Sequence, residues 1–273
     1  MRRPVCLLTD YGIGDSYVGQ VKGVIATTAP GSPIVDITHD IEPFAVDEAA
    51  WTLEVTLPHL PEDAVIMAVV DPGVGSDRAA LVLEDREGRL LVGPDNGLLA
   101  GAVADDLRVN SKVNLGRSDV LCRVLNLPNL GIDPSKASAT FHGRDVFGRV
   151  AALLASEISF EAVGESISSI TSCGSLRASP STDAALEARV IHIDRFGNLV
   201  TTLHRSQLPT EEIALLVRGT SVSHRVRTFG DLMPGELGWH EDSSGFIALA
   251  GNQMSAATSL GASRGDPILV KLR

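Results

Sequence analysis

The stretch from Ala64 to Arg78 reads AVIMAVVDPGVGSDR, an apolar run followed by a glycine-rich loop. A short apolar run bounded by such a loop is typical of a buried strand. The strand would deliver Asp71 at its end, and the loop carries Arg78 seven residues later. Enzymes often place catalytic groups on loops that leave the ends of core strands. This stretch therefore predicts a buried strand with a candidate site at its end.

Strand and helix signals alternate on both sides of this stretch. The alternating elements are expected over 5–9, 15–29, 34–38, 47–57 and 64–70. Two further runs, 79–83 and 90–92, are joined by the tight turn Asp85–Gly88 and predict a hairpin. This pattern is typical of an α/β domain, which we assign to residues 1–160.

The composition and periodicity of the sequence change after this domain. Residues 161–187 are rich in serine and lack clear periodicity, so we interpret them as a linker. Beyond them, strand-like runs separated by turns cover 190–194, 199–203, 214–217, 246–250 and 268–271. We therefore expect residues 188–273 to form a smaller all-β domain, a sandwich or a barrel.

Composition limits the classes of partner. The chain has 273 residues, is 44% hydrophobic and carries a formal net charge of -11. An acidic chain is a poor partner for nucleic acid, and no apolar run approaches the ~18 residues of a membrane span. Three cysteines without paired spacing, and an Asp10 that ends the first apolar run too early for a signal peptide, predict a cytoplasmic protein.

A second loop, residues 140–145, carries a histidine and leads into the apolar-periodic stretch 146–154. We expect His142 to meet Asp71 and Arg78 around one water molecule, which they would make nucleophilic. A Mn or Zn site is the competing interpretation, using Asp10, His39, Asp71, His142 and Asp145. Their spacing matches no recognised metal motif, so we predict no metal. A metal-dependent phosphoesterase remains an alternative.

Six motifs in order carry a family resemblance. They are Thr9–Gly12, Val35–His39, Val70–Gly75, Pro94–Gly97, Phe141–Asp145 and Ile193–Asn198. With them the chain resembles the S-adenosylmethionine (SAM) hydrolases, also called SAM hydroxide adenosyltransferases, over residues 5–270. This family is related to the bacterial fluorinase and chlorinase.

The resemblance implies a fold, a reaction and an assembly. The fold is an N-terminal α/β domain followed by a C-terminal β-barrel. The reaction cleaves SAM with water to give adenosine and methionine, and it needs no cofactor. The assembly is a homotrimer whose substrate lies between the N-terminal domain of one subunit and the C-terminal domain of the next. A non-catalytic adenosine- or SAM-binding protein is the second alternative.

The resemblance also implies roles for residues. Asp71, Arg78 and His142 fall on the family's water-activating triad. Asp10 falls on the position that binds the ribose hydroxyls. The other expected substrate-binding residues, which include the segment that holds the methionine end and adenine, are Phe44, Asn96, Asp194, Phe196, Asn198 and Ser243. For Asp36 and His39, a structural hydrogen bond and a ligand contact both remain open.

Departures from the halogenases bear on the nucleophile. Those enzymes have Tyr where this chain has His142, and the fluorinase has Ser in place of Gly143 and a longer loop between residues 79 and 92. We therefore predict no halide pocket. Ser244 stands where the fluorinase has an arginine near the methionine carboxylate, so the ligand of that carboxylate stays open.

Overall fold

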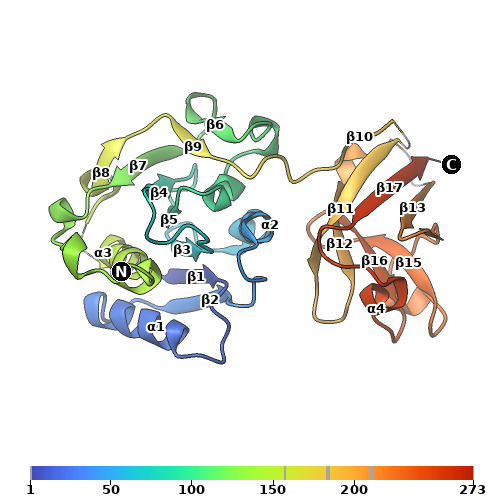
Figure 1. Ribbon diagram of the computed structural model, residues 1–273, viewed down its shortest axis with the longest axis horizontal. Helices are drawn as coiled ribbons and strands as arrows, with labels where there is room; N and C mark the ends of the chain where they lie inside the picture. The colour runs from blue at the N-terminus through green and yellow to red at the C-terminus, as the bar shows by residue number, and fades with distance from the viewer. Residues whose placement is uncertain (1, 157, 183–184, 210–211, 273) are drawn as a thin grey trace. The chain divides into compact units, whose positions relative to one another are not determined.

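The computed structural model describes residues 2–156, 158–182, 185–209 and 212–272. The chain divides into two compact units, residues 1–175 and 176–273, each with its own core (Figure 1). Within the described residues, no helix is long and apolar enough to cross a membrane.

The first unit is built on a seven-stranded mixed sheet. Its strands, in spatial order, are β2 (Ile34–Thr38), β1 (Val5–Thr9), β3 (Val65–Val69), β5 (Leu90–Pro94), β4 (Ala80–Glu84), β7 (Leu121–Leu125) and β8 (Gly164–Ser166). The first four run parallel, whereas β4 pairs antiparallel with both β5 and β7. The predicted α/β class and the β4–β5 hairpin are confirmed.

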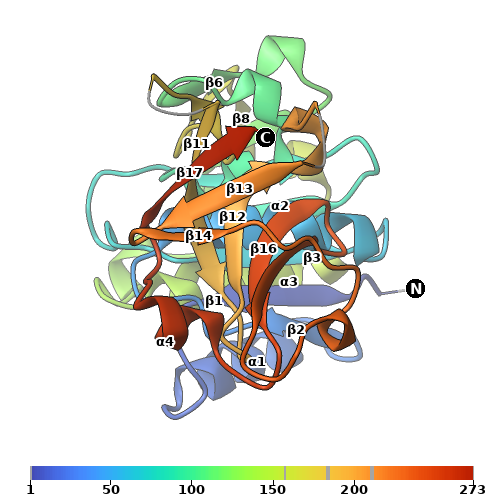
Figure 2. The same ribbon diagram turned by 90° about the vertical axis from the view of Figure 1, so that its right-hand side faces the viewer.

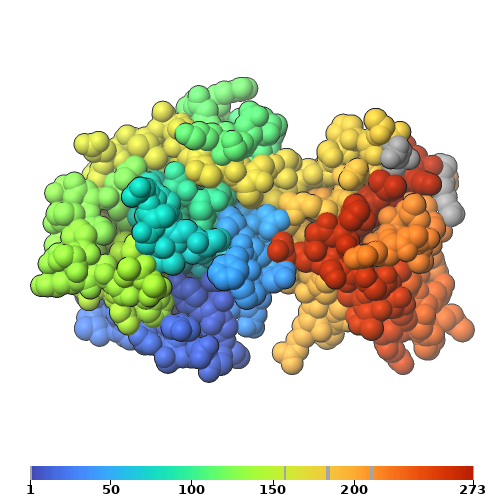
Figure 3. Space-filling model, in the orientation of Figure 1, coloured from blue at the N-terminus to red at the C-terminus, as the bar shows by residue number. Residues whose placement is uncertain are grey.

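Helices cover both faces of this sheet. α1 (Tyr17–Thr28) and α3 (Gly148–Ser156) pack side by side on one face, as Figures 1 and 3 show. α2 (Val46–Thr56) and the 3-10 helix Leu98–Ala102 pack on the other face. Successive strand residues point to opposite faces, so Leu7 joins the α1–α3 core and Leu8 joins the α2 core.

The predicted linker, 161–187, includes regular structure. β8 extends the main sheet, and β9 (Ser169–Thr171) pairs with β6 (Lys112–Asn114). The boundary between the two compact units falls after Ser175, so the short strand β10 (Ser179–Pro180) already belongs to the second unit. These edge strands are two or three residues long, too short to show an alternating apolar pattern.

The second unit is an antiparallel sheet that forms a nearly closed barrel (Figure 2). The order is β14 (Thr220–Val222), β13 (Ile213–Val217), β17 (Pro267–Leu272), β11 (Leu186–Ile193), β12 (Leu199–His204), β16 (Phe246–Gly251) and β15 (Leu237–Glu241), with β10 beside β11. A bridge from Arg225 to Trp239 brings the two ends of this order together. Among the described residues of this unit, the one α-helix is the five-residue α4 (Ala256–Leu260). The predicted all-β domain is confirmed.

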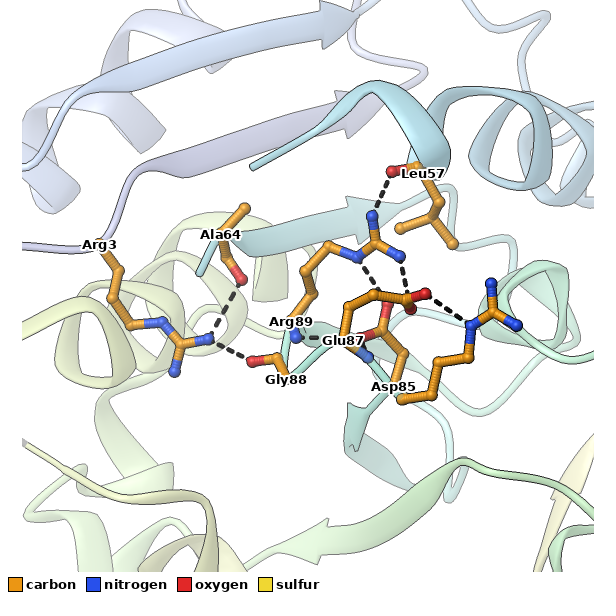
Figure 4. A network of polar contacts seen from close by, with 8 residues as sticks. Arg3, Leu57, Ala64, Asp85, Glu87, Gly88 and Arg89 are labelled. Carbon is orange, nitrogen blue, oxygen red and sulfur yellow. Dashed lines mark hydrogen bonds and ion pairs between the residues drawn. The ribbon is translucent and has the colours of Figure 1, made fainter. Parts of the chain in front are cut away.

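The turn between β4 and β5 is held by a polar network (Figure 4). Arg89 donates to Asp85 Oδ2 at 2.6 Å, to Glu87 Oε2 at 2.9 Å and to the carbonyl of Leu57. Arg3, which precedes β1, donates to Gly88 O at 2.6 Å. The turn therefore lies at the edge where the parallel strands begin. We took its shortness as a reason for the missing halide pocket, and this was wrong, because Asp10 and Asp71 lie at the opposite edge.

Candidate active site

The candidate site of the first unit lies at the carboxyl edge of the parallel strands. Asp10 follows β1 directly, and Asp71 comes two residues after β3. These strands are neighbours in register, with Thr9 opposite Val69. Both carboxylates therefore leave the same edge of the sheet, which is where α/β proteins bind their ligands.

Asp71 and Arg78 form a bidentate ion pair. Arg78 Nε lies 2.9 Å from both carboxylate oxygens, and Nη2 donates to Oδ2. The Asp71 side chain is only 6% exposed and the Arg78 side chain only 10% exposed. The guanidinium also lies 5.1 Å from the centre of the Phe147 ring. Such a fork fixes the direction of the arginine more firmly than a single bond does.

Gly75 allows the Asp71–Arg78 loop to reach the histidine loop. Its φ is +78°, and a Cβ there would stand 2.6 Å from the carbonyl oxygen of Ala139. A side chain at this position would therefore push the two loops apart. Arg78 Nη2 instead reaches to 3.2 Å from His142 Nδ1, so the three predicted catalytic residues are neighbours.

The contact with Arg78 fixes how the His142 ring is protonated. A guanidinium has donors only, so Nδ1 must present its lone pair and we assign the proton to Nε2. Burial and the positive charge of Arg78 lower the pKa of His142, although Asp71 and Asp145 act in the other direction. His142 is therefore neutral near pH 7, and its basic nitrogen faces the arginine.

Tyr11, which we did not assign to the site, packs against both chain neighbours of His142. Its ring makes an edge contact with Phe141 at 5.7 Å between centroids. A Cβ on Gly143 would lie 2.0 Å from the Tyr11 hydroxyl. Burial and the carboxylates of Asp10 and Asp71 raise the pKa of this phenol. The sequence signal was present, because Tyr11 follows Asp10 within a family motif.

Residues 143–147 form one turn of π-helix between His142 and α3. Such turns are rare and occur frequently at functional sites. The predicted apolar helix is therefore present, but it begins with this wider turn.

Phe44 contacts Asp10 through its backbone. The Phe44 N–H donates to Asp10 Oδ2 at 3.1 Å. Its φ is +69°, which is rare for a bulky residue, and 70% of its surface is exposed. Backbone strain of this kind clusters at ligand sites. Burial raises the pKa of Asp10, as does Asp71, whereas the Phe44 N–H lowers it.

Asn96 is engaged by the backbone. Its Nδ2 donates to Val70 O at 2.8 Å, and its Oδ1 accepts from Leu98 N at 3.2 Å. The side chain thus ties the end of β5 to the segment that carries Asp71. A contact with substrate stays a prediction.

Each of the five residues considered as metal ligands already contacts the protein: Asp71 and His142 share Arg78, and Asp10 accepts from the Phe44 N–H. Asp145 pairs with Arg144 at 2.7 Å, Asp71 with Arg78, and His39 with Thr9 at 2.8 Å. Across residues 2–272, the masked positions aside, no three His, Cys, Asp or Glu side chains form a group that could hold a metal ion.

The second unit contains the other predicted substrate residues. Asp194 Oδ1 accepts from the N–H groups of Phe196 and Asn198, both at 2.9 Å, and Oδ2 accepts from Asn198 Nδ2 at 2.8 Å. This carboxylate therefore shapes the loop rather than standing open. The loop presents Phe196 with 78% of its surface exposed.

A cavity of about 550 Å³ adjoins this loop. Its lining residues are Phe196, Asn198, Phe229, Gly251, Gln253, Met254 and Ser255. Sequence reasoning missed the last five, although the Gly251-Asn252 pair after a strand was a turn signal. Ser243 is not among the lining residues and lies exposed in the turn between β15 and β16.

Comparison with known proteins agrees with this two-unit architecture. Residues 5–164 match the SAM hydroxide adenosyltransferase N-terminal domain, and residues 188–269 match the C-terminal domain of that family. A protein named (R)-S-adenosyl-L-methionine hydrolase from Salinispora tropica is 39% identical over 269 residues, covering 97% of each chain.

Proteins with lower sequence identity also match over nearly the whole chain. A crystal structure of an uncharacterized conserved protein from Thermotoga maritima has a TM-score of 0.83 at 31% identity, and the match covers 98% of this chain and 99% of that one. A fluorinase from an Actinoplanes species is 26% identical, with 91% of this chain and 90% of that one covered. The chain belongs to the SAM hydroxide adenosyltransferase family.

Proposed function

We propose that the protein hydrolyses SAM to adenosine and L-methionine. The observation that carries this proposal is the contact between Arg78 Nη2 and the basic Nδ1 of a neutral His142, beside Asp10 and Asp71. Family membership and the name of the Salinispora tropica relative support the choice of substrate.

The leaving group determines what the protein must supply. The sulfonium of SAM departs as a neutral thioether, so its departure needs neither an acid nor a metal. The barrier lies in the nucleophile, because water is weak and hydroxide is scarce at pH 7. A base and a fixed positive charge are therefore the groups that help most.

The attacking water would insert between Arg78 Nη2 and His142 Nδ1 and replace their direct hydrogen bond, so that it accepts from Nη2 and donates to the lone pair of Nδ1. Its oxygen forms the new bond to C5′ while the C5′–S electron pair moves to sulfur, releasing methionine. The proton of the water passes to Nδ1, and Arg78 stabilises the developing hydroxide. Asp71 holds Arg78 in place by its two-oxygen contact. The proton then leaves to solvent.

Asp10 would hold the ribose. A carboxylate can accept hydrogen bonds from two vicinal hydroxyls. We place the adenine and methionine ends at the Asp194–Asn198 loop and its cavity, supplied by a neighbouring subunit of a homotrimer. Light scattering tests the trimer, because a fully active monomer would contradict it.

The reaction, as we propose it, uses no cofactor and no metal. The protein would act in the cytoplasm, where the thiols of Cys6, Cys122 and Cys173 would stay reduced. Incubation with SAM, followed by chromatography, should yield equal amounts of adenosine and methionine, and a chelator should leave the rate unchanged. Binding without turnover would contradict the proposal, and loss of the rate with chelator would favour a metal-dependent reaction.

A further inference from the structure

His39 lies at the end of β2 and is only 5% exposed. Its ring contacts two side chains. Nδ1 lies 2.8 Å from Thr9 Oγ1, and Nε2 lies 3.2 Å from Asp36 Oδ1. Both ring nitrogens therefore face side chains of the protein, Nδ1 through a hydrogen bond with Thr9 and Nε2 at an ion-pair distance from Asp36.

The charges around His39 give the contacts a direction. The Asp36 carboxylate favours a proton on Nε2, so Nδ1 accepts from the Thr9 hydroxyl. Thr9 Oγ1 in turn accepts from the Tyr11 N–H at 3.3 Å. Lys22 Nζ lies 2.6 Å from Asp36 Oδ2. Burial raises the pKa of Asp36, but the bonds from Lys22 and His39 outweigh it and hold that pKa below its usual value.

These contacts converge on the backbone around Asp10. Thr9 and Tyr11 are its two chain neighbours, and both belong to the His39 chain of contacts. The Gly12 N–H donates to the His39 carbonyl at 2.8 Å. Phe44, five residues after His39, donates its N–H to the Asp10 carboxylate. The segment from His39 to Phe44 therefore holds Asp10 by its backbone and by its side chain.

We propose that His39 is a positioning residue, which fixes the orientation in which Asp10 binds the vicinal ribose hydroxyls. The inference rests on the proposed function, because that function assigns the ribose to Asp10. A carboxylate that serves two hydroxyls must be held within about 0.5 Å of its productive place. Asp10 Oδ2 already accepts from Phe44, so a rotation of Asp10 would cost it this bond as well as the ribose bonds.

The test compares two ligands that differ only at the ribose. Dissociation constants for adenosine and 2′,3′-dideoxyadenosine are measured by calorimetry on the intact protein. Asp10→Ala should abolish the preference for adenosine and serves as the reference. His39→Leu should weaken adenosine binding by about fivefold to tenfold, while dideoxyadenosine binding changes by less than about twofold.

Matched variants separate positioning from loss of folding. His39→Asn keeps an acceptor near the place of Nδ1 and should retain most of the preference. Thr9→Val removes the hydroxyl at nearly the same volume and should behave like His39→Leu, whereas Thr9→Ser should resemble wild type. If His39→Leu unfolds the protein, the Thr9 pair gives the answer alone.

The outcomes distinguish this inference from the proposed reaction. The positioning role would be overturned if His39→Leu and Thr9→Val weakened the binding of both ligands equally or left both affinities unchanged. It would also be overturned if the wild type did not prefer adenosine to dideoxyadenosine. Hydrolysis is assayed separately. A wild type that prefers adenosine and loses the preference in Thr9→Val, yet does not cleave SAM, would overturn the reaction and leave the positioning role standing.

Discussion

Two edges of the same sheet carry buried arginine–carboxylate pairs of nearly equal exposure. Arg89 and Asp85 are 8% and 5% exposed, and Arg78 and Asp71 are 10% and 6% exposed. Burial therefore does not distinguish the two pairs. Their further contacts differ: Arg89 also binds Glu87 and the Leu57 carbonyl, whereas Arg78 contacts the lone pair of His142 Nδ1. The contacts of Arg89 hold the turn between β4 and β5, whereas Arg78 faces an imidazole that can accept a proton.

Removing the arginine of the Arg89–Asp85 pair should have the largest effect, and it should lower stability without changing ligand binding. Arg89→Met leaves the Asp85 carboxylate buried without its cation, which should cost about 3–5 kcal/mol of unfolding free energy. Urea denaturation measures this loss. Adenosine affinity of the folded variant should match wild type. A selective loss of affinity would show that the two edges are coupled and would break the comparison.

Removing His142, the proposed base, should lower activity and leave binding intact. His142→Ala should lower the rate of SAM hydrolysis by at least about 10²-fold, as for a lost general base, and keep adenosine affinity. Steady-state kinetics and calorimetry measure the two effects. Activity near that of wild type would remove His142 from the mechanism.

The packing of Tyr11 on Gly143 gives a prediction of intermediate size. Gly143→Ala should lower the rate by about tenfold or more, because its Cβ collides with the Tyr11 hydroxyl and displaces the neighbouring His142. Tyr11→Phe removes the atom in closest contact, so the double variant should be faster than Gly143→Ala.

Tyr17→Phe is the matched control for this pair. Tyr17 belongs to the same ring cluster, at 6.3 Å from Tyr11, but it makes none of the three closest contacts with the Gly143 position. The control change should not rescue Gly143→Ala. Equal rescue by both phenylalanine variants would contradict the steric account.

The smallest expected effect is on pH dependence. As the proposed base, His142 must be neutral to accept a proton, and its lowered pKa keeps it neutral down to pH values below the usual histidine range. Hydrolysis should therefore change by less than about twofold between pH 6.5 and 8 and fall only at lower pH. A profile of kcat/KM against pH measures this. A midpoint above pH 7 would mean that the histidine is not the base or that its surroundings are different.

Periodicity was sufficient for the long elements of the fold. The strand before Asp71 and the helix before Pro30 were predicted because their apolar residues recur at strand and helix spacing. β8 and β9 were not, because three-residue edge strands have no period to detect. Compact structure therefore extends further along the chain than the composition suggested.

For the site, the sequence indicated residues but not their partners. Asp71, Arg78 and His142 lie together as expected, whereas the contact between Tyr11 and Gly143 joins loops that are more than a hundred residues apart. The mistaken link between the Asp85–Gly88 turn and a halide pocket has the same origin. Which edge a turn occupies depends on strand order, and strand order is a property of the folded chain.

Isotope labelling tests the central claim most directly. SAM is incubated with the protein in ¹⁸O-water containing chloride, and the nucleoside products are analysed by mass spectrometry. We predict adenosine with the label at its 5′-oxygen and no more than a trace of 5′-chloro-5′-deoxyadenosine, because in the mechanism that we propose Arg78 and His142 activate water at C5′. Unlabelled adenosine, or the chlorinated nucleoside as the main product, would contradict the account.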